Sequence, residues 1–266
     1  MRHVPILMYH EISDEPVAAS RLAVAPEAFA RQLDYLHDSG RVPVTAGQIA
    51  SAMSATRRGE RGTELPAKPV VLTFDDGFAD FHQAALPLLL RHGFTASVFV
   101  TTGWIASSPP WPGGPAKMLS WGAIEEIAAC GIEIGAHSIR HPELDRLDSG
   151  PLHRELAGSK HALEDRLGAR VPGMAYPFGY SSRLVRAMAA EVGYEYACTV
   201  ANRRASGSAD PFALPRLTVG RSASMPVFAR SVASRRLPVR FAGYRALTAA
   251  WAPVRKARAG LNRLVS

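Results

Sequence analysis

The stretch PVVLTFDDG, residues 69–77, carries the strongest fold signal in the chain. A six-residue run, apolar except for Thr73, is followed at once by two carboxylates and a glycine. A strand without polar alternation is typical of a parallel sheet, in which helices cover both faces. The stretch therefore predicts a buried parallel strand whose carboxyl end carries Asp75 and Asp76.

On both sides of this strand, short apolar runs alternate with segments of helical periodicity. Further strands are predicted at residues 4–9, 96–100, 132–135, 174–176 and 195–200. Helices are predicted at residues 26–39, 79–91, 121–130, 152–167 and 182–192, and a Thr45/Gln48 capping box begins another. Repeated βα units indicate an α/β fold, an irregular (β/α) barrel with its chemistry at the carboxyl ends of the strands.

Two polar motifs follow predicted strand ends. The adjacent carboxylates Asp75 and Asp76 are costly unless a cation or a proton separates them. His137 and His141, four residues apart, share one face of a helical turn and can converge on one ion. Taken singly, these motifs are a solvated Asp-Gly turn and a chance pair of surface histidines. Together they predict a metal site with one aspartate ligand and two histidine ligands, and the other aspartate remains available as a base.

A third motif, Tyr176-Pro177-Phe178-Gly179, follows another predicted strand. Its proline and glycine restrict the backbone, and this could direct an N–H toward a reacting oxygen. Without the other two motifs it would be an ordinary turn.

The three motifs at residues 73–77, 137–141 and 176–179 resemble, in order and spacing, those of the NodB-type polysaccharide deacetylases, carbohydrate esterase family 4. The resemblance covers about residues 1–220, and Trp121 and the stretch 155–168 also fit. It implies a distorted (β/α)7 barrel. It also implies a hydrolase that removes N-acetyl groups from a polysaccharide, an oligosaccharide or a lipid-linked glycan and releases acetate.

The same resemblance implies roles for individual residues. Asp75 would be the general base, and the backbone N–H of Phe178 would stabilise the oxyanion. The implied ligands of a divalent metal, zinc or else cobalt or nickel, are Asp76, His137 and His141. The implied substrate contacts are Tyr176, Pro177 and Trp121.

Two positions depart from the family pattern. Ala175 occupies the place where members often have an arginine that tethers the base, so another residue must orient Asp75. Leu214-Pro215-Arg216 stands where many members have a Leu-x-His motif with the general acid, and no histidine follows His161.

The missing acid can come from the other end of the chain. In the branch that deacetylates poly-N-acetylglucosamine, motif order is permuted and the acid follows the first strand. His10 has this position here. Because the first and last strands of a closed barrel are neighbours, we expect His10 to reach the site as the general acid. The alternative is a histidine that serves only packing or hydrogen bonding.

The net charge of +8 is unevenly distributed. No acidic residue follows Asp210, and residues 216–266 hold 11 of the 31 basic residues. The first 215 residues therefore hold 20 basic and 23 acidic residues. We predict a barrel at residues 1–222 and a basic, helical extension at residues 223–266.

The extension contains an amphipathic pattern among its arginines. Its apolar members are Phe241, Tyr244, Leu247, Trp251 and Val254. Such a helix suits an anionic membrane surface, contacted through residues 226–266, or equally packing on the barrel. The chain has no recognisable signal peptide or spanning stretch, which predicts a cytoplasmic protein that can lie at the inner face of the membrane. Nucleic acid is not an expected partner, because no recognition motif accompanies the basic residues.

Three alternatives remain at the level of sequence. Two histidines and a carboxylate also serve non-haem iron oxygenases, although those commonly pair His-x-Asp with a distant histidine. Another metal-dependent amidohydrolase is a second possibility. A degenerate barrel that binds glycans without catalysis is the third, and the departures at Ala175 and Arg216 favour it. Acetate release without an oxygen requirement separates the deacetylase from the oxygenase and from the binding module.

Overall fold

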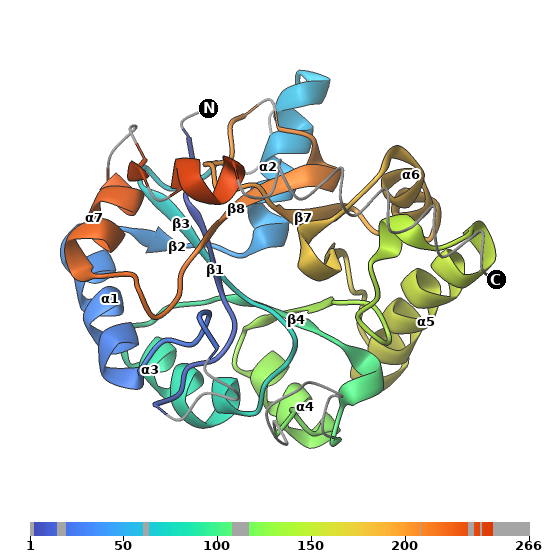
Figure 1. Cartoon of the computed structure of the whole chain (residues 1–266), viewed down its shortest axis with the longest axis horizontal. Coiled ribbons are helices and arrows are strands. Elements are labelled where there is room, and N and C mark those ends of the chain that lie inside the picture. The colour runs from blue at the N-terminus through green and yellow to red at the C-terminus, as the bar shows by residue number, and fades with distance from the viewer. Residues whose placement is uncertain are drawn as a thin grey trace.

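Seven parallel strands close into a barrel, and helices surround it (Figure 1). The computed structural model describes residues 3–14, 20–60, 64–107, 117–207, 209–233, 237–239 and 241–246. The strand order is β1-β8-β7-β6-β5-β4-β3, and β1 also pairs with β3, which completes the ring. The predicted (β/α)7 barrel is thus confirmed.

The barrel strands alternate with helices along the chain. The strands are β1 Ile6–Tyr9, β3 Pro69–Phe74, β4 Ser97–Val100, β5 Glu133–Ala136, β6 Gly173–Ala175, β7 Tyr196–Val200 and β8 Leu214–Thr218; the short β2 Val42–Pro43 pairs with the start of β3. The helices are α1 Pro26–Asp38, α2 Ala46–Arg58, α3 Leu86–Arg91, α4 Trp121–Ala129, α5 Ser149–Leu167, α6 Arg183–Glu191 and α7 Met225–Ala233. The capping box at Thr45 is present at the start of α2, as predicted.

Strand β3 is buried along its whole length because its two faces contact different layers. Val70, Leu72 and Phe74 belong to the core between the barrel and the helices. Val71 belongs to the cluster inside the barrel, together with Phe99 of β4. Since side chains alternate along a strand, the inward series continues through Thr73 to Asp75 at the carboxyl end.

Two local features differ from the sequence prediction. The helix expected at residues 79–91 begins with a π-helical turn, Phe81–Ala85, before α3. Strand β8 was not predicted from periodicity, because its buried Arg216 is unusual in a barrel strand. A charge can be buried there because its partner comes from β3, far away in the sequence.

The described part of the C-terminal extension packs on the barrel. α7 contacts α1, as Figure 1 shows at their shared side of the barrel. Phe228, Val232 and Phe241 are all buried in the core between barrel and helices. Leu247, Trp251 and Val254 of the predicted apolar stripe lie outside the described residues. Among the described residues, none of the helices combines the length and apolarity that a bilayer crossing requires.

Candidate active site and metal centre

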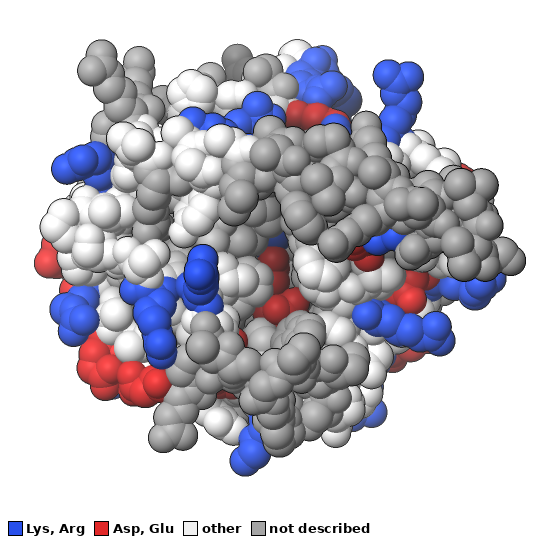
Figure 2. Space-filling view, viewed as in Figure 1, with Lys and Arg blue, Asp and Glu red and all other residues white. Residues whose placement is uncertain are grey.

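The carboxyl ends of the barrel strands surround a cavity of about 470 Å³. Its lining includes His10 after β1, Asp75 and Asp76 after β3, His137 after β5 and Phe178 after β6. Figure 2 shows acidic side chains at the bottom of a hollow near the centre of this face. The three motifs recognised in the sequence therefore meet in one place.

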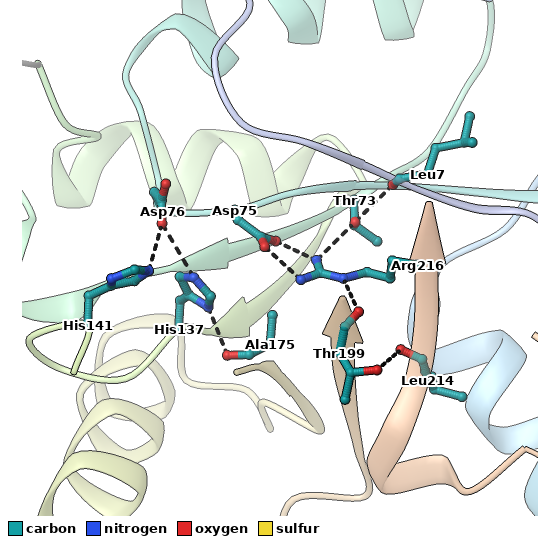
Figure 3. Close-up of polar contacts among 10 residues, drawn as sticks. All are labelled: Leu7, Thr73, Asp75, Asp76, His137, His141, Ala175, Thr199, Leu214 and Arg216. Atoms are coloured by element: carbon teal, nitrogen blue, oxygen red, sulfur yellow. Dashed lines mark hydrogen bonds and ion pairs between the residues drawn. The ribbon is translucent and has the colours of Figure 1, made fainter. Parts of the chain in front are cut away.

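Asp76, His137 and His141 converge on one point (Figure 3). The Nε2 atoms of His137 and His141 lie 3.3 Å and 3.4 Å from Oδ1 of Asp76. One donor atom from each residue lies within 4.8 Å of the others. Oδ1 of Asp76 is buried and has no hydrogen-bond partner among the described residues. A buried carboxylate oxygen that faces two imidazole nitrogens without a well-formed hydrogen bond is what a cation site requires.

The spacing of these atoms fits a divalent cation. Bonds of about 2.0–2.1 Å in a tetrahedral site place neighbouring ligand atoms about 3.3–3.4 Å apart, close to the two observed separations. Nδ1 of His137 lies 2.8 Å from the carbonyl oxygen of Ala175. A proton on Nδ1 donates to this carbonyl and leaves the Nε2 lone pair free for a metal. The three residues are therefore suitable metal ligands.

The backbone around the cavity is strained at four residues. Asp76, Ser138, His141 and Phe178 have φ angles of 75°, 65°, 58° and 59°. Non-glycine residues rarely adopt this left-handed region, and each such residue costs about 1–3 kcal/mol. The surrounding fold stabilises these conformations at the point where three motifs present their functional groups.

Asp75 is held by an arginine that sequence analysis did not identify as its partner. Nη1 and Nη2 of Arg216 donate to the two carboxylate oxygens of Asp75 at 2.5 Å and 2.7 Å. Arg216 also donates to Oγ1 of Thr73 and to the carbonyl oxygen of Thr199 (Figure 3). Arg216 is fully buried. The arginine that is absent at Ala175 is thus replaced by one from β8.

Charges within the cavity set the protonation of its groups. Burial alone would raise the pKa of Asp75, but the adjacent Arg216 guanidinium and then His137 hold it below its ordinary value. Burial would likewise raise the pKa of Asp76, and contact with His137 and the charge of His10 lower it instead. Burial, and after it the neighbouring His137 ring, lower the pKa of His141 to about 4. These shifts favour ionised Asp75 and Asp76 and neutral His141 at neutral pH, which are the forms suited to a base and to metal ligands.

His10 lies in the cavity, as expected from strand order. Tyr9 of β1 is in register with Phe74 of β3, and the backbone N–H of Asp75 donates to the carbonyl oxygen of Tyr9. His10 therefore follows β1 at the level where Asp75 follows β3. Its Nδ1 atom is buried without a hydrogen-bond partner among the described residues.

The third motif contributes one residue to the cavity. Phe178 lines it, and its ring is 52% exposed and 4.6 Å from that of His141. Tyr176 is fully buried, and its hydroxyl donates to the carbonyl oxygen of Phe212. Pro177 is buried and Trp121 packs against the outer core, so these three predicted substrate contacts lie outside the residues that line the cavity.

Several curated proteins similar to this chain are deacetylases by name, among them the polysaccharide deacetylase YxkH. YxkH of Bacillus subtilis (strain 168) is 29% identical over 232 residues, which is 87% of this chain and 76% of YxkH. Poly-beta-1,6-N-acetyl-D-glucosamine N-deacetylase of Escherichia coli (strain K12) is 32% identical over 99 residues, which is 37% of this chain and 14% of that protein. The second match thus concerns a small part of a much longer relative.

Solved structures share the barrel over most of the chain. The Streptococcus pyogenes deacetylase PplD, in complex with acetate, has a TM-score of 0.76 and 28% identity, and the match covers 87% of this chain and 98% of PplD. IcaB from Ammonifex degensii has a TM-score of 0.70 and 25% identity, with coverage of 87% and 97%.

A family model described as polysaccharide deacetylase matches residues 62–197, just over half of the chain. The matched segment includes the Asp75-Asp76 pair, both histidines of the candidate metal centre and Phe178. The chain therefore belongs to the polysaccharide deacetylase family and is a carbohydrate N-deacetylase.

Proposed function

We propose that this deacetylase is a metal-dependent hydrolase that converts an N-acetylated sugar residue of a glycan to the free amine and acetate. The observation that supports this most strongly is the convergence of Asp76, His137 and His141, with the Arg216-bound carboxylate of Asp75 beside them. Zinc suits this ligand set of one carboxylate and two imidazoles, and cobalt or nickel also fit it. When bound, the divalent cation polarises the acetyl carbonyl and lowers the pKa of a coordinated water.

The residues of the chain supply the proton transfers. Asp75, ionised because Arg216 lowers its pKa, takes a proton from the water that attacks the acetyl carbon. The backbone N–H of Phe178 donates to the carbonyl oxygen as negative charge develops on it. His10 gives a proton to the sugar nitrogen while the C–N bond breaks. The oxygen of water ends in acetate, and the amine leaves neutral.

An exposed aromatic ring that lines the cavity supports a sugar as the substrate. Phe178 is exposed beside His141, and its ring stacks on that of Tyr180 with centroids 5.9 Å apart and an interplanar angle of 26°. Flat apolar surfaces of this kind pack well against the C–H faces of pyranose rings. A polysaccharide, an oligosaccharide and a lipid-linked glycan all present such a ring.

The alternative of a non-catalytic glycan-binding barrel loses its support. It rested on the missing tethering arginine and the missing late histidine. Arg216 reaches Asp75 from β8, and His10 lines the cavity from β1. The tethering of the base and the donation of a proton to the leaving amine thus each have a candidate residue in this chain.

The test is an acetate-release assay on metal-loaded protein with chitooligosaccharides, poly-N-acetylglucosamine fragments and lipid-linked N-acetyl sugars. We expect acetate in stoichiometric amounts with free amine, no oxygen consumption, and about one divalent metal per chain. Glycan binding without acetate release from any of these substrates would contradict the proposal. An oxygen requirement would favour the iron oxygenase instead.

A peripheral contact with anionic membranes through residues 226–266 is a separate proposal. Within the described residues, Phe241 is buried and Arg245 donates to the carbonyl oxygen of Asn202, so the first part of the extension is anchored to the barrel. The proposal therefore depends on the basic residues and apolar side chains that follow. Flotation with anionic liposomes, with and without residues 247–266, tests it; equal flotation would end it. If bound, the protein would act at the inner face of the membrane.

A further inference from the structure

The loop that joins the two metal-binding histidines cannot keep its shape through its own hydrogen bonds. Three residues separate His137 from His141, and Ser138 and His141 are both left-handed. Within the loop, the N–H of His141 donates to Oγ of Ser138 at 3.0 Å. The position of His141 relative to His137 therefore depends on groups outside the loop.

Two carbonyl groups of the loop accept hydrogen bonds from the segment after β4. The N–H of Thr102 donates to the carbonyl oxygen of Ser138 at 3.1 Å, and the N–H of Gly103 donates to that of Ile139 at 2.8 Å. A Cβ atom on Gly103 would lie 2.5 Å from the latter oxygen, so this approach requires glycine.

Two N–H groups of the same loop donate to a single carboxylate oxygen from α5. Oε2 of Glu155 accepts the N–H of Ile139 at 2.8 Å and the N–H of Arg140 at 3.0 Å. Glu155 is 8% exposed. One helical turn further along α5, Gly158 leaves the room that the side chain of Ile139 occupies. Because hydrogen bonds to a charged acceptor are stronger than neutral ones, Glu155 is the main support on this side.

We infer that Glu155 is a positioning residue that presets His141 against His137, so that both Nε2 atoms face Asp76 before a metal arrives. This inference rests on the proposed metal centre. Loss of the carboxylate leaves two adjacent, partly buried N–H groups without this acceptor, and the loop then relaxes from its two left-handed residues. His141, at the far end of the loop, moves away from Asp76, and the metal loses one of its three ligands.

The experiment measures metal affinity directly, by competition between apo-protein and a chromophoric zinc chelator. Glu155→Ala should weaken zinc binding about 10–100-fold, the usual effect of removing an outer support of a metal ligand. Glu155→Gln should lie closer to wild type, because an amide oxygen can accept both N–H groups. Cobalt substitution adds a spectroscopic signature, and the visible absorption of Co²⁺ should change in Glu155→Ala but not in the control.

The matched control is Glu164→Ala on the same helix. Glu164 also accepts a backbone N–H, that of Val171 at 2.8 Å, and it pairs with Lys160. It supports the loop after α5 and has no contact with the cavity. We expect Glu164→Ala to lower thermal stability and to leave zinc affinity and the Co²⁺ spectrum unchanged.

Two results would overturn the inference. Zinc affinity of Glu155→Ala equal to that of wild type would make Glu155 a purely structural residue, and Glu155→Gln as weak as Glu155→Ala would show that the accepted hydrogen bonds do not matter. If Glu155→Ala does not fold, Glu155→Asp replaces it in the experiment. Its shorter side chain keeps the charge but moves the carboxylate oxygen away from the two N–H groups. Zinc affinity of Glu155→Asp equal to that of wild type would also contradict the inference. Absence of zinc binding by wild type would instead refute the proposed metal centre.

Discussion

Arg216 and Asp75 form a bidentate pair between distant parts of the chain, with both carboxylate oxygens bound. The two residues are 141 positions apart in sequence and lie on β8 and at the end of β3. Both are buried, at 0% and 3% exposure. A planar guanidinium that binds both oxygens fixes the plane of the carboxylate as well as its charge. Arg216 therefore fixes the orientation of the Asp75 carboxylate at the cavity, as the proposed role of Asp75 as the base requires.

Arg216→Lys should fold and lose much of its activity. Lysine keeps the positive charge but cannot bind both oxygens in a fixed plane, so we expect kcat/KM to fall about 10–100-fold. Because the pKa of Asp75 is then lowered less, the acidic limb of the kcat/KM profile should move to higher pH. Arg186→Lys, at the half-exposed ion pair with Asp210, is the control and should leave the profile unchanged. An unshifted profile in Arg216→Lys would argue against Asp75 as the base.

Asp75 and Asp76 should separate into a catalytic function and a metal-binding function. Asp75→Asn should retain metal and lose at least about 10³-fold in kcat. Asp76→Ala should lose both, because a ligand is removed. Metal bound to the folded state raises stability by about 2.7 kcal/mol at a hundred times Kd. Added zinc should therefore raise the Tm of wild type and Asp75→Asn but not that of Asp76→Ala. A Tm rise in Asp76→Ala would place the metal elsewhere.

The sequence predicted the barrel and most of the cavity because both depend on local patterns. Buried β-runs such as residues 69–74 and polar residues directly after them identify the strand ends, and parallel order brings the ends together. The place of His10 followed from the family resemblance together with strand order. The register of β1 against β3 places His10 at the same level as Asp75, the position that neighbouring strands lead one to expect.

Contacts between side chains that are far apart in the sequence could not be predicted from local patterns. Arg216 was noted as the residue that replaces a histidine, but nothing in its local sequence indicates Asp75 as its partner. Glu155 reaches the 137–141 loop from the middle of a long helix, where a glutamate is ordinary. Tyr176 sits in a recognised motif, yet strand alternation turns its side chain away from the cavity, to Phe212.

His10 should matter for amide substrates and much less for activated esters. The general acid is needed because an amine leaves poorly without a proton, whereas a nitrophenolate leaves unaided. We expect His10→Gln to lower kcat on an N-acetylated oligosaccharide about 10²–10⁴-fold and on 4-nitrophenyl acetate by less than about tenfold. Asp75→Asn should impair both reactions, because both need the attacking water. If His10→Gln loses activity equally on the two substrates, His10 is not the general acid and instead supports the metal centre or the packing around it.

Asp80 should make the protein less stable as the pH rises to neutrality. Burial, opposed by the backbone N–H groups of Ile12 and Phe81 and reinforced by the charge of Glu11, raises the pKa of Asp80 to about 7. In the unfolded chain an aspartate has a pKa of about 3.9. The folded state therefore holds the proton of Asp80 more tightly than the unfolded chain does. The contribution of this proton to the free energy of unfolding is complete below about pH 4 and is lost as the pH rises through 7.

Asp80→Asn removes this dependence, since its side chain is neutral at every pH. Relative to wild type, the free energy of unfolding of Asp80→Asn should rise between pH 4 and pH 8, by up to about 4 kcal/mol at 1.36 kcal/mol per pKa unit. Urea denaturation of both proteins at pH 4 and at pH 8 gives the four free energies of unfolding that this comparison needs. Asp165→Asn, an exposed carboxylate on α5, is the control for the change of residue type. Parallel pH dependence in wild type and Asp80→Asn would mean that Asp80 is ionised in the folded protein at neutral pH, so that burial does not raise its pKa.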